Sequence, residues 1–422
     1  MAKIITHPSL FNYNEIDQLG DLERFKIALD GIDDEALMRK LEKKRKKGRN
    51  DYPIRVMWNL IIAMKVFCHQ SVESFRRELA RNSQLRRICG LSDEIKRKHL
   101  IPPARVFSQF IKMVKEEQEE IDRIFNEQVT ALYEMIPGFG EKIAGDGKYL
   151  DSYAKRKSPR DKSDADERSE RDAEWSVKEY HYTDKQGKKQ SKKEYHYGFK
   201  GHIICDVESE LPIAYSLTAA NVDEKKAMKD LLKSNIISNE RRVQAAKHLL
   251  LDRGYDSLDM IQTIKEAGIT PIIDIRNCWK DGEETKQYKN TNMIYNYQGS
   301  VYYVDKAGNP HKMIYEGYDK QKKCLRYSHE GKTHKIYTSY DERIFLPIAR
   351  DSKKFKRLYK GRTAVERLNG RLDRDYMFED HYIRGQGKMK VMLGLSLIIM
   401  TGMAIGKLKN GKTGIRSLKT AA

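Results

Sequence analysis

The hydrophobic pattern of the chain changes at residues 137–140, and this change limits the folds that the sequence can adopt. Before it, apolar residues recur at the spacing of amphipathic helices, ending with one long expected helix over residues 103–136. After it, short apolar runs with strand-like alternation are separated by helical segments. Strands followed by alternating helices and strands indicate an α/β core, so we expect an all-helical domain followed by an α/β domain. The expected core elements are strands at 142–147, 195–205, 211–217, 248–251 and 269–275, and helices at 224–232 and 258–268.

Within the helical domain, residues 71–90 form a candidate helix-turn-helix. Ser71 can cap a helix with the sequence VESFRRELARN, and a second short helix, SQLRRICG, ends at Gly90. Such a pair can place its second helix in the major groove of DNA. Packing in a plain helical bundle is the other interpretation, and the sequence leaves both open.

Three further segments complete the expected organisation. Residues 153–193 are polar and charge-mixed without periodicity, which predicts a long loop or insertion. Residues 280–345 hold ten of the 24 tyrosines in short alternating runs, which predicts a β-rich insertion. The apolar stretch Val391–Ile405 is short and interrupted by Gly, Ser and Thr, so we expect a buried core helix and no membrane span. The expected domains are a helical DNA-binding domain (1–140), the first part of the core (141–279), the insertion (280–345), the helical last part of the core (346–408) and a loose basic tail (409–422).

The net charge of the chain indicates which kind of molecule it binds. The chain carries 81 Lys+Arg against 61 Asp+Glu, a formal net charge of +20. Residues 281–422 hold 29 of the basic and 15 of the acidic residues, so +14 of the charge lies there. This concentration favours a polyanion, most often nucleic acid, and a solubilising surface is the alternative. We therefore expect DNA to lie mainly against the last third of the chain.

Cysteine usage and the first residues indicate the compartment. The five cysteines are scattered, odd in number and without a Cys-x-x-Cys pair, which argues against a disulfide framework and a structural zinc site. The opening MAKIITHPSL lacks a long apolar signal region. We expect a cytoplasmic, nucleoid-associated protein with no membrane partner. The sequence has no Gly-rich phosphate loop followed by Lys-Ser or Lys-Thr, so it does not indicate ATP use.

Three acidic residues could carry phosphoryl-transfer chemistry. Asp146 lies in GDGKYLDS at the expected end of a strand, Asp252 directly follows the strand HLLL, and Glu366 lies on an expected helix. Carboxyl ends of strands are where α/β sheets place ligand sites. Carboxylates gathered there can hold two divalent ions roughly 3.5–4 Å apart, which activate an attacking oxygen and stabilise a leaving one. Mg²⁺ suits such a site because it prefers oxygen ligands, and Mn²⁺ is the expected substitute. Taken singly, these acids are no more distinctive than Asp151, Asp206, Asp256 or Asp373.

Their joint context is a set of five motifs in a fixed order: GDGKYLDS, YGFKGHIICD, AANVDE, LLLDRGYDS and YKGRTAVERLNGRL. From about residue 50 to 408 the chain resembles DDE transposases of bacterial insertion sequences, in particular the branch with a Tyr-x2-Arg-x3-Glu-x6-Lys signature and a β-rich insertion before the catalytic Glu. The resemblance implies a ribonuclease-H-like core with Asp146, Asp252 and Glu366 as catalytic metal ligands. It also implies double-stranded DNA as partner, with terminal inverted repeats and target DNA bound by a homodimer on paired ends.

The resemblance further suggests which residues contact DNA. Tyr359 and Arg362 match the first two signature positions, where Tyr can donate to a phosphate oxygen and Arg can hold phosphate bidentately. An ordinary ion pair on a surface helix is the alternative for Arg362. The signature Lys falls on Asp373, so either Arg371 or Arg374 takes over its DNA contact or that contact is absent.

Trp279 opens the expected insertion. In related transposases, an aromatic residue of this insertion can stack on an extruded base near the transposon end. An anchoring tryptophan in the core of the insertion is the alternative. We keep Trp279 as a candidate DNA-binding residue.

The sequence as a whole predicts a Mg²⁺-dependent DNA transposase that hydrolyses the phosphodiester at the element end and joins the freed 3′-hydroxyl to target DNA. Two alternatives remain. One is a metal-dependent nuclease of similar fold that cleaves without strand transfer. The other is a non-catalytic DNA-binding protein descended from a transposase.

Overall fold

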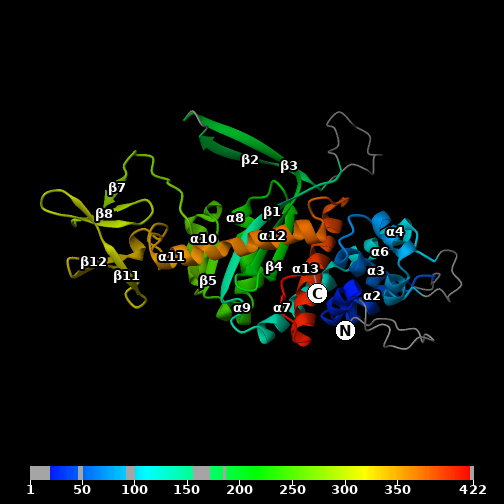
Figure 1. The fold of residues 1–422 in the computed structure, drawn as a ribbon. Coiled ribbons are helices and arrows are strands. Elements are labelled where there is room, and N and C mark those ends of the chain that lie inside the picture. The colour runs from blue at the N-terminus through cyan, green and yellow to red at the C-terminus, as the bar shows by residue number, and fades with distance from the viewer. Residues whose placement is uncertain (1–19, 46–50, 92–99, 155–171, 184–186, 419–422) are drawn as a thin grey trace.

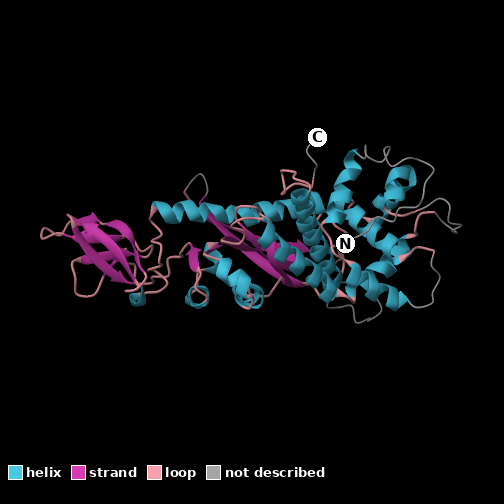
Figure 2. Cartoon of the chain, turned by 90° about the horizontal axis from the view of Figure 1, so that it is seen from below, coloured by secondary structure: helices cyan, strands magenta, loops and turns pink. Residues whose placement is uncertain are grey.

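The computed structural model describes residues 20–45, 51–91, 100–154, 172–183 and 187–418 (Figure 1). Helices gather at one end of the molecule, a mixed sheet lies in the middle, and two small sheets lie at the other end (Figure 2). This order follows the chain except at its C-terminal end, where the last helices return across the middle and into the helical end (Figure 1).

The N-terminal end is helical, as expected. Ser71 accepts a hydrogen bond from the Ser74 N–H at 3.1 Å and so caps its helix, and Asn82 caps the next by accepting from the Leu85 N–H at 2.9 Å. The two helices of the candidate helix-turn-helix are therefore present and joined through Asn82. The helices are α1 (Glu23–Asp30), α2 (Glu35–Arg45), α3 (Ile54–Val66), α4 (Val72–Arg81), α5 (Ser83–Ile88), α6 (Ala104–Lys115) and α7 (Gln118–Met135).

The single long helix expected over residues 103–136 is wrong, because α6 and α7 are separate helices. Glu117 leaves helical geometry, with φ −111° and ψ 37°. The Lys44 ammonium holds the carboxylates of Glu116 and Glu117 at 3.1 and 2.6 Å. Apolar spacing continues across this break, so periodicity could not reveal it.

The central sheet is mixed. Its strands are β1 (Lys142–Asp151), β2 (Glu174–Thr183), β3 (Lys189–Asp206), β4 (Pro212–Ala219), β5 (His248–Leu251) and β6 (Thr270–Ile273). β3 pairs antiparallel with β1 and with β4, whereas β5 pairs parallel with β1 and β6 pairs parallel with β5. The spatial order β4-β3-β1-β5-β6 is therefore three antiparallel strands followed by two parallel ones. This is the sheet of a ribonuclease-H-like fold, and the predicted α/β class is confirmed.

Helices provide the connections to the parallel strands. α8 (Glu224–Leu232) and α9 (Glu240–Ala245) precede β5, and α10 (Leu258–Glu266) joins β5 to β6. Asp223 and Ser257 cap α8 and α10 by accepting from backbone N–H groups three residues on. Parallel strands need such crossovers, and the crossover places the residues that follow β5 beside the second half of β1.

The long polar loop expected over residues 153–193 is wrong for its second half, which forms a two-stranded ribbon. β2 pairs antiparallel with the first half of β3, from Glu174↔Gly198 to Thr183↔Lys189. The ribbon projects away from the rest of the molecule (Figure 1). Both of its faces meet solvent, so the strands lack the apolar alternation by which a half-buried strand is recognised. Residues 155–171 of the expected loop lie outside the described residues.

The β-rich insertion consists of two small antiparallel sheets with a shared core. One sheet contains β7 (Thr285–Gln287), β8 (Met293–Asn296), β9 (Val301–Val304) and β10 (Pro310–Lys312), and the other β11 (Ile314–Asp319), β12 (Cys324–His329) and β13 (Lys332–Tyr337). The hairpin expected around Gly299 is the β8–β9 turn, where Gly299 takes a φ of 81°. Aromatic side chains such as Tyr295, Tyr327 and Phe345 fill the core between the sheets.

Three helices end the described chain: α11 (Lys353–Tyr359), α12 (Thr363–Tyr376) and α13 (Gln386–Lys409). α13 is the one helix of the described residues that is long and apolar enough to cross a membrane, but 94% of its apolar window is buried inside the fold. It contains the expected core helix and packs between α1 and α7. Gly406 makes this close approach possible, because a Cβ there would lie 2.1 Å from the Ile27 carbonyl oxygen.

The tail after α13 is docked as far as Leu418, where we expected a loose segment. The Lys407 ammonium donates to the carbonyl oxygens of Gly414 and Ser417 at 3.0 and 2.8 Å. The Arg416 guanidinium binds the buried Glu210 carboxylate at 3.0 Å, and Leu418 is itself buried. Composition could not show this, because the Arg416–Glu210 contact joins the tail to a residue 206 positions earlier. Residues 419–422 lie outside the described residues.

Candidate active site

Asp146 and Asp252 lie side by side on neighbouring parallel strands. β1 and β5 pair from Lys142↔His248 to Gly145↔Leu251. The residue after Gly145 is Asp146, and the residue after Leu251 is Asp252. Asp252 follows the last residue of β5, as expected. Asp146 is not at the end of its strand, because β1 continues to Asp151 in pairing with β3 after β5 has ended. It instead marks the point at which β1 loses its β5 neighbour and its side chain gains room.

Local hydrogen bonds hold both carboxylates. An Oδ1 oxygen of Asp146 accepts from the Gly147 N–H at 2.9 Å, and Oδ1 of Asp252 accepts from the Gly254 N–H at the start of a short 3-10 turn. Burial raises the pKa of Asp146 to about 6, and the nearby carboxylates of Asp252 and Glu224 add to this rise against the opposing Gly147 N–H and Arg362. Burial and the neighbouring carboxylates therefore disfavour the charged form of the Asp146 side chain.

Glu366 lies on α12, which packs against β1. Its carboxylate binds the Arg362 guanidinium at 2.6 Å and is 48% exposed. The turn Lys360–Arg362 at the start of α12 contacts both β1 and β5, the strands that lead to the two aspartates. The expected ion pair between positions i and i+4 is thus present, and it lies beside the two aspartates.

Tyr359 belongs to the same cluster. The Arg362 guanidinium lies 5.8 Å from the centre of its ring. Burial raises the pKa of the Tyr359 hydroxyl, and Arg362 opposes this rise. Its ring stacks on Phe355 at 5.7 Å. Gly361 lets this α11–α12 junction lie on the sheet, since a Cβ there would come within 2.8 Å of Val207 and 3.0 Å of Leu250.

The donor set of this cluster fits a divalent cation. It consists of carboxylate oxygens, which Mg²⁺ and Mn²⁺ prefer as ligands. A bound cation would also favour the charged form of Asp146, which burial disfavours. Within the described residues, however, the acids do not form a closed group of three around one point. Glu366 is turned to Arg362, so it must leave that pair to join the two aspartates.

Two residues that sequence reasoning did not assign lie beside the cluster. Glu224, the first residue of α8, acts on Asp146 and binds the ammonium of the buried Lys200 at 2.9 Å. Lys200, whose role the sequence left undecided, also lies 4.5 Å from the ring centre of Tyr149. The sequence contains a signal for Glu224, because this residue ends the AANVDE motif, but the order of the five motifs assigns no role to it.

Lys148 is another residue near the cluster to which the sequence assigned no role. It follows Asp146 by two positions, so both side chains leave the same face of β1. Its ammonium binds the Asp373 carboxylate at 2.6 Å. Asp373 is the position where the signature has Lys. In the structure a lysine of β1, Lys148, therefore binds the acid that stands at this position of α12.

The two candidates for the signature lysine are placed differently. Arg371 is buried and donates to the carbonyl oxygens of Arg416, at 2.7 Å, and Glu210. Arg374 is exposed and binds the neighbouring Asp375 at 2.9 Å. A DNA contact by either residue stays a prediction, and Arg374 is the one that solvent reaches.

Trp279 lies with the insertion. Its ring is 6.0 Å from that of Tyr295, and the Lys286 ammonium lies 4.7 Å from its centre. The side chain is half-buried against the core of the insertion. The anchoring interpretation thus has contacts in its favour, and base stacking by the exposed part stays a prediction.

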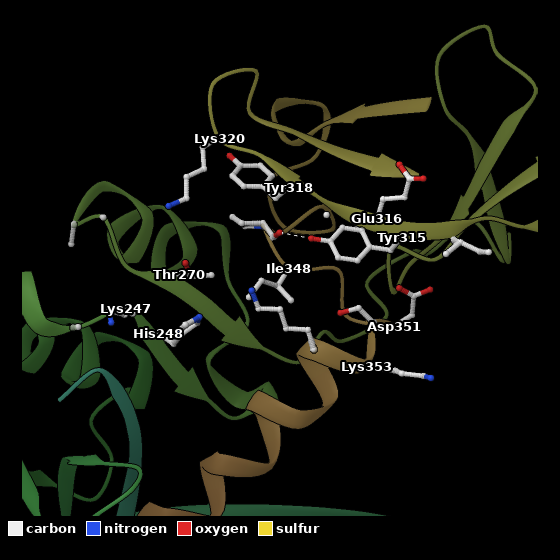
Figure 3. Close-up of a pocket in the computed structure, with 18 of the residues that line it drawn as sticks. Lys247, His248, Thr270, Tyr315, Glu316, Tyr318, Lys320, Ile348, Asp351 and Lys353 are labelled. Atoms are coloured by element: carbon white, nitrogen blue, oxygen red, sulfur yellow. Dashed lines mark hydrogen bonds between the residues drawn. The ribbon is translucent and has the colours of Figure 1, made fainter. Parts of the chain in front are cut away.

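A large cavity lies elsewhere, between the core and the insertion (Figure 3). It has a volume of about 1240 Å³ and is lined by His248 and Thr270, the first residues of β5 and β6, and by residues of β11 such as Tyr315. Since Asp252 follows the other end of β5, the cavity and the acidic cluster are at opposite edges of the sheet.

The fold and the cluster define a class: a ribonuclease-H-like core with acids at the carboxyl edge of its sheet. Two family profiles match the chain, "Transposase DDE domain" over residues 166–401 and "Transposase domain (DUF772)" over residues 14–113. The first covers more than half of the chain, which therefore belongs to the DDE transposase family and is a DNA transposase. Asp252 and Glu366 lie within that match, and Asp146 precedes it.

Among solved structures, the chain is similar to that titled as a cryo-EM structure of the piggyBac transposase synaptic complex with hairpin DNA. The identity is 12% and the TM-score 0.39, over 94% of this chain and 77% of that chain. This likeness is too distant to place individual residues. No curated protein matches the chain.

Proposed function

We propose that Asp146, Asp252 and Glu366 hold two Mg²⁺ ions and that the chain uses them to cut element ends and join the 3′-hydroxyl ends to target DNA. The parallel β1–β5 register, which sets Asp146 beside Asp252 under the Arg362–Glu366 pair, is the observation that carries the proposal. Divalent ions bound there would activate the attacking oxygen and stabilise the leaving one. Mn²⁺ would replace Mg²⁺ with the same ligands.

The side chains around the acids have distinct tasks in this proposal. Glu366 leaves Arg362 to complete the ligand set, which frees the guanidinium to bind the scissile phosphate with two parallel N–H groups. Tyr359 donates its hydroxyl to a phosphate oxygen on the Asp252 side. The two residues thus orient the phosphodiester for in-line attack, first by water and then by the freed 3′-hydroxyl.

The remaining parts of the proposal concern partners. Residues 1–140 help recognise terminal inverted repeats, and Arg374 and the exposed part of Trp279 contact DNA. Because two ends must be cut together, a homodimer on paired ends is the working form, and it needs no ATP. The protein acts at the nucleoid of the cytoplasm.

The test is Mg²⁺-dependent nicking of a supercoiled plasmid that carries the DNA flanking the reading frame. We expect Asp146→Asn, Asp252→Asn and Glu366→Gln each to lower nicking at least 1000-fold, because each removes a ligand charge. Asp259→Asn is the matched control, since Asp259 is an exposed acid on α10 that binds Lys229. Nicking that persists in Asp146→Asn would refute the ligand assignment.

Sequencing of the products separates the transposase from its alternatives. New junctions between element ends and target DNA are expected from strand transfer. Nicks without junctions would indicate the nuclease, and binding of inverted repeats without any Mg²⁺-dependent nicks would indicate the non-catalytic descendant.

A further inference from the structure

The β2–β3 ribbon begins at the edge of the sheet that carries the acidic cluster. β1 runs toward this edge, and its last residue, Asp151, pairs with Gly198 of β3. β3 then continues beyond β1 and pairs with β2 alone, from Gly198 back to Lys189. The ribbon therefore extends from the same edge as Asp252, on the side where a DNA substrate must approach.

One face of the ribbon is apolar and open to solvent. Trp175 is opposite Tyr197 and Val177 is opposite Tyr195 in the β2–β3 register, so these four side chains share a face. Trp175, Val177 and Tyr195 are 42%, 52% and 62% exposed. Large apolar side chains gathered in this way on an exposed surface indicate a partner.

The outer part of the ribbon has more lysines than acidic residues. The segment Gly187–Lys193, GKKQSKK, has four lysines and no acidic residue. Lys192 and Lys193 are both exposed and lie on opposite faces of the ribbon. Lys193 shares the face of Val177 and Tyr195, with Glu179 directly opposite it, and Lys192 binds Glu194 at 3.4 Å. The lysine-rich end of the ribbon complements the charge of a polyanion, and the aromatic residues nearer the core complement its apolar parts. Two copies would repel each other at their lysine-rich ends.

The dimensions of the ribbon fit duplex DNA. The major groove admits a two-stranded β-ribbon. Ile203 of β3 is opposite Asp146, and Lys193 lies ten residues further out, which is about 33 Å along an extended strand. One turn of B-form DNA is about 34 Å long. The lysines thus lie about one helical turn from the acidic cluster.

We infer that the β2–β3 ribbon binds the duplex that flanks the phosphodiester being cut, about one turn from the cut. Lys192 and Lys193 neutralise phosphates, and the face of Trp175 and Tyr195 packs against the groove. The inference rests on the proposed function, which supplies the substrate and fixes the reference point at Asp146. It assigns a role to a segment that the sequence presented only as a polar loop.

The test measures binding of the full chain to a fluorescein-labelled 40-base-pair duplex of mixed sequence between 50 and 300 mM KCl. Each lost phosphate contact lowers the slope of log affinity against log salt by about 0.9, so Lys192→Gln with Lys193→Gln should lower it by about 2. Trp175→Ala with Tyr195→Ala should weaken binding at every salt concentration and leave the slope unchanged. All these positions are exposed, so the variants should keep the wild-type thermal unfolding midpoint.

Lys142→Gln with Lys247→Gln is the matched control. Lys142 begins β1 and Lys247 directly precedes β5, so both lie at the opposite edge of the same sheet, and each binds a glutamate, as Lys192 does. The control removes the same charge and should keep the wild-type slope. An equal slope in the Lys192/Lys193 variant and the control would overturn the inference. A dimer that becomes monomeric in the Trp175/Tyr195 variant, with DNA affinity unchanged, would also overturn it, because the face would then bind a second copy.

Failure of the proposed function has a different signature. Asp146→Asn with Asp252→Asn should bind the duplex with the wild-type slope even though it cannot cut. If wild-type protein shows the ribbon-dependent slope but no Mg²⁺-dependent nicking, the catalytic proposal fails and DNA binding by the ribbon stands.

Discussion

At the scale of single residues, the acidic cluster places a carboxylate where its charged form is disfavoured, and the proposed metal site needs that charged form. Burial raises the pKa of Asp146 to about 6, and the neighbouring carboxylates of Asp252 and Glu224 add to this rise. Its charged form is therefore disfavoured in the folded protein without metal. A cation would relieve this, which is a reason for the site to bind one.

This cost predicts that Asp146→Asn stabilises the metal-free protein at neutral pH. The pKa of Asp146 is raised in the folded state, so the stability it contributes is present below about pH 4 and is lost as the pH rises through about 6. The loss amounts to roughly 3 kcal/mol at 1.36 kcal/mol per pKa unit. Urea unfolding in EDTA at pH 4.5 and 7.5 measures it. The gap between variant and wild type should widen at pH 7.5, and an equal gap at both pH values would contradict the assigned cause.

The sequence predicted part of this site. The order of the family motifs singled out Asp146, Asp252 and Glu366, and their roles as metal ligands stay predictions. The strand-end position expected from the local pattern holds for Asp252, whereas Asp146 lies within β1. The pairing of Lys148 with Asp373 joins positions 225 apart, and no local pattern contains it. The burial of Arg371 depends likewise on the tail and on Glu210.

At the scale of elements, the sequence predicted the strands that have a buried face, and it did not predict the ribbon, whose two faces are exposed to solvent. The short apolar strands β5 and β6 and the hairpin around Gly299 occur as expected. The sequence predicts a loop where the β2–β3 ribbon lies, because both faces of the ribbon meet solvent and its strands lack the apolar alternation of a half-buried strand. The break between α6 and α7 was missed because ion pairs from α2 hold it.

The packing of α13 on α1 gives a prediction with a built-in control. A Cβ at Gly406 would lie 2.1 Å from the Ile27 carbonyl, whereas nothing lies within 4 Å of a Cβ at Gly370 on α12. Gly406→Ala should cost about 1–3 kcal/mol by overpacking. Gly370→Ala should be neutral or stabilise by up to about 1 kcal/mol through helix propensity. Urea unfolding of both variants checks this, and similar values for the two would argue against close α1–α13 packing.

At the scale of the whole molecule, the charge count overstates the DNA-binding surface of the last third. Several of its cations are internal: Arg350, Arg371 and Lys407 are each less than 10% exposed and donate to carbonyl oxygens. These residues fasten the insertion and the tail to the core. The concentration of +14 charge after residue 280 is thus partly structural, and binding of DNA there stays a prediction.

One of these fastenings can be tested through Arg343, which joins the end of the insertion to the loop after Asp252. Its guanidinium binds the Asp256 carboxylate at 2.5–3.2 Å, and that side chain is fully buried. Arg343→Ala leaves a buried charge without its cation and should cost about 3–5 kcal/mol. Arg326→Ala on the exposed face of β12 should stay within about 0.5 kcal/mol of wild type. Thermal unfolding measures both, and equal midpoints would show that Asp256 does not depend on Arg343.

The burial of α13 has a consequence for the order in which the protein is made. Gln128 of α7 donates to the Gly31 carbonyl at 2.8 Å and accepts from the Thr401 hydroxyl at 2.6 Å, so one amide joins the first, middle and last helices. The Lys409 ammonium reaches the Asp30 carbonyl across 379 positions of sequence. Contacts this distant along the chain slow folding, because the intervening loop must close first. On the ribosome, α1 and α7 must wait for nearly the whole chain before their apolar faces are covered. A nascent copy that stalls before α13 therefore exposes those faces, and it is a substrate for chaperones and proteases before it is an enzyme.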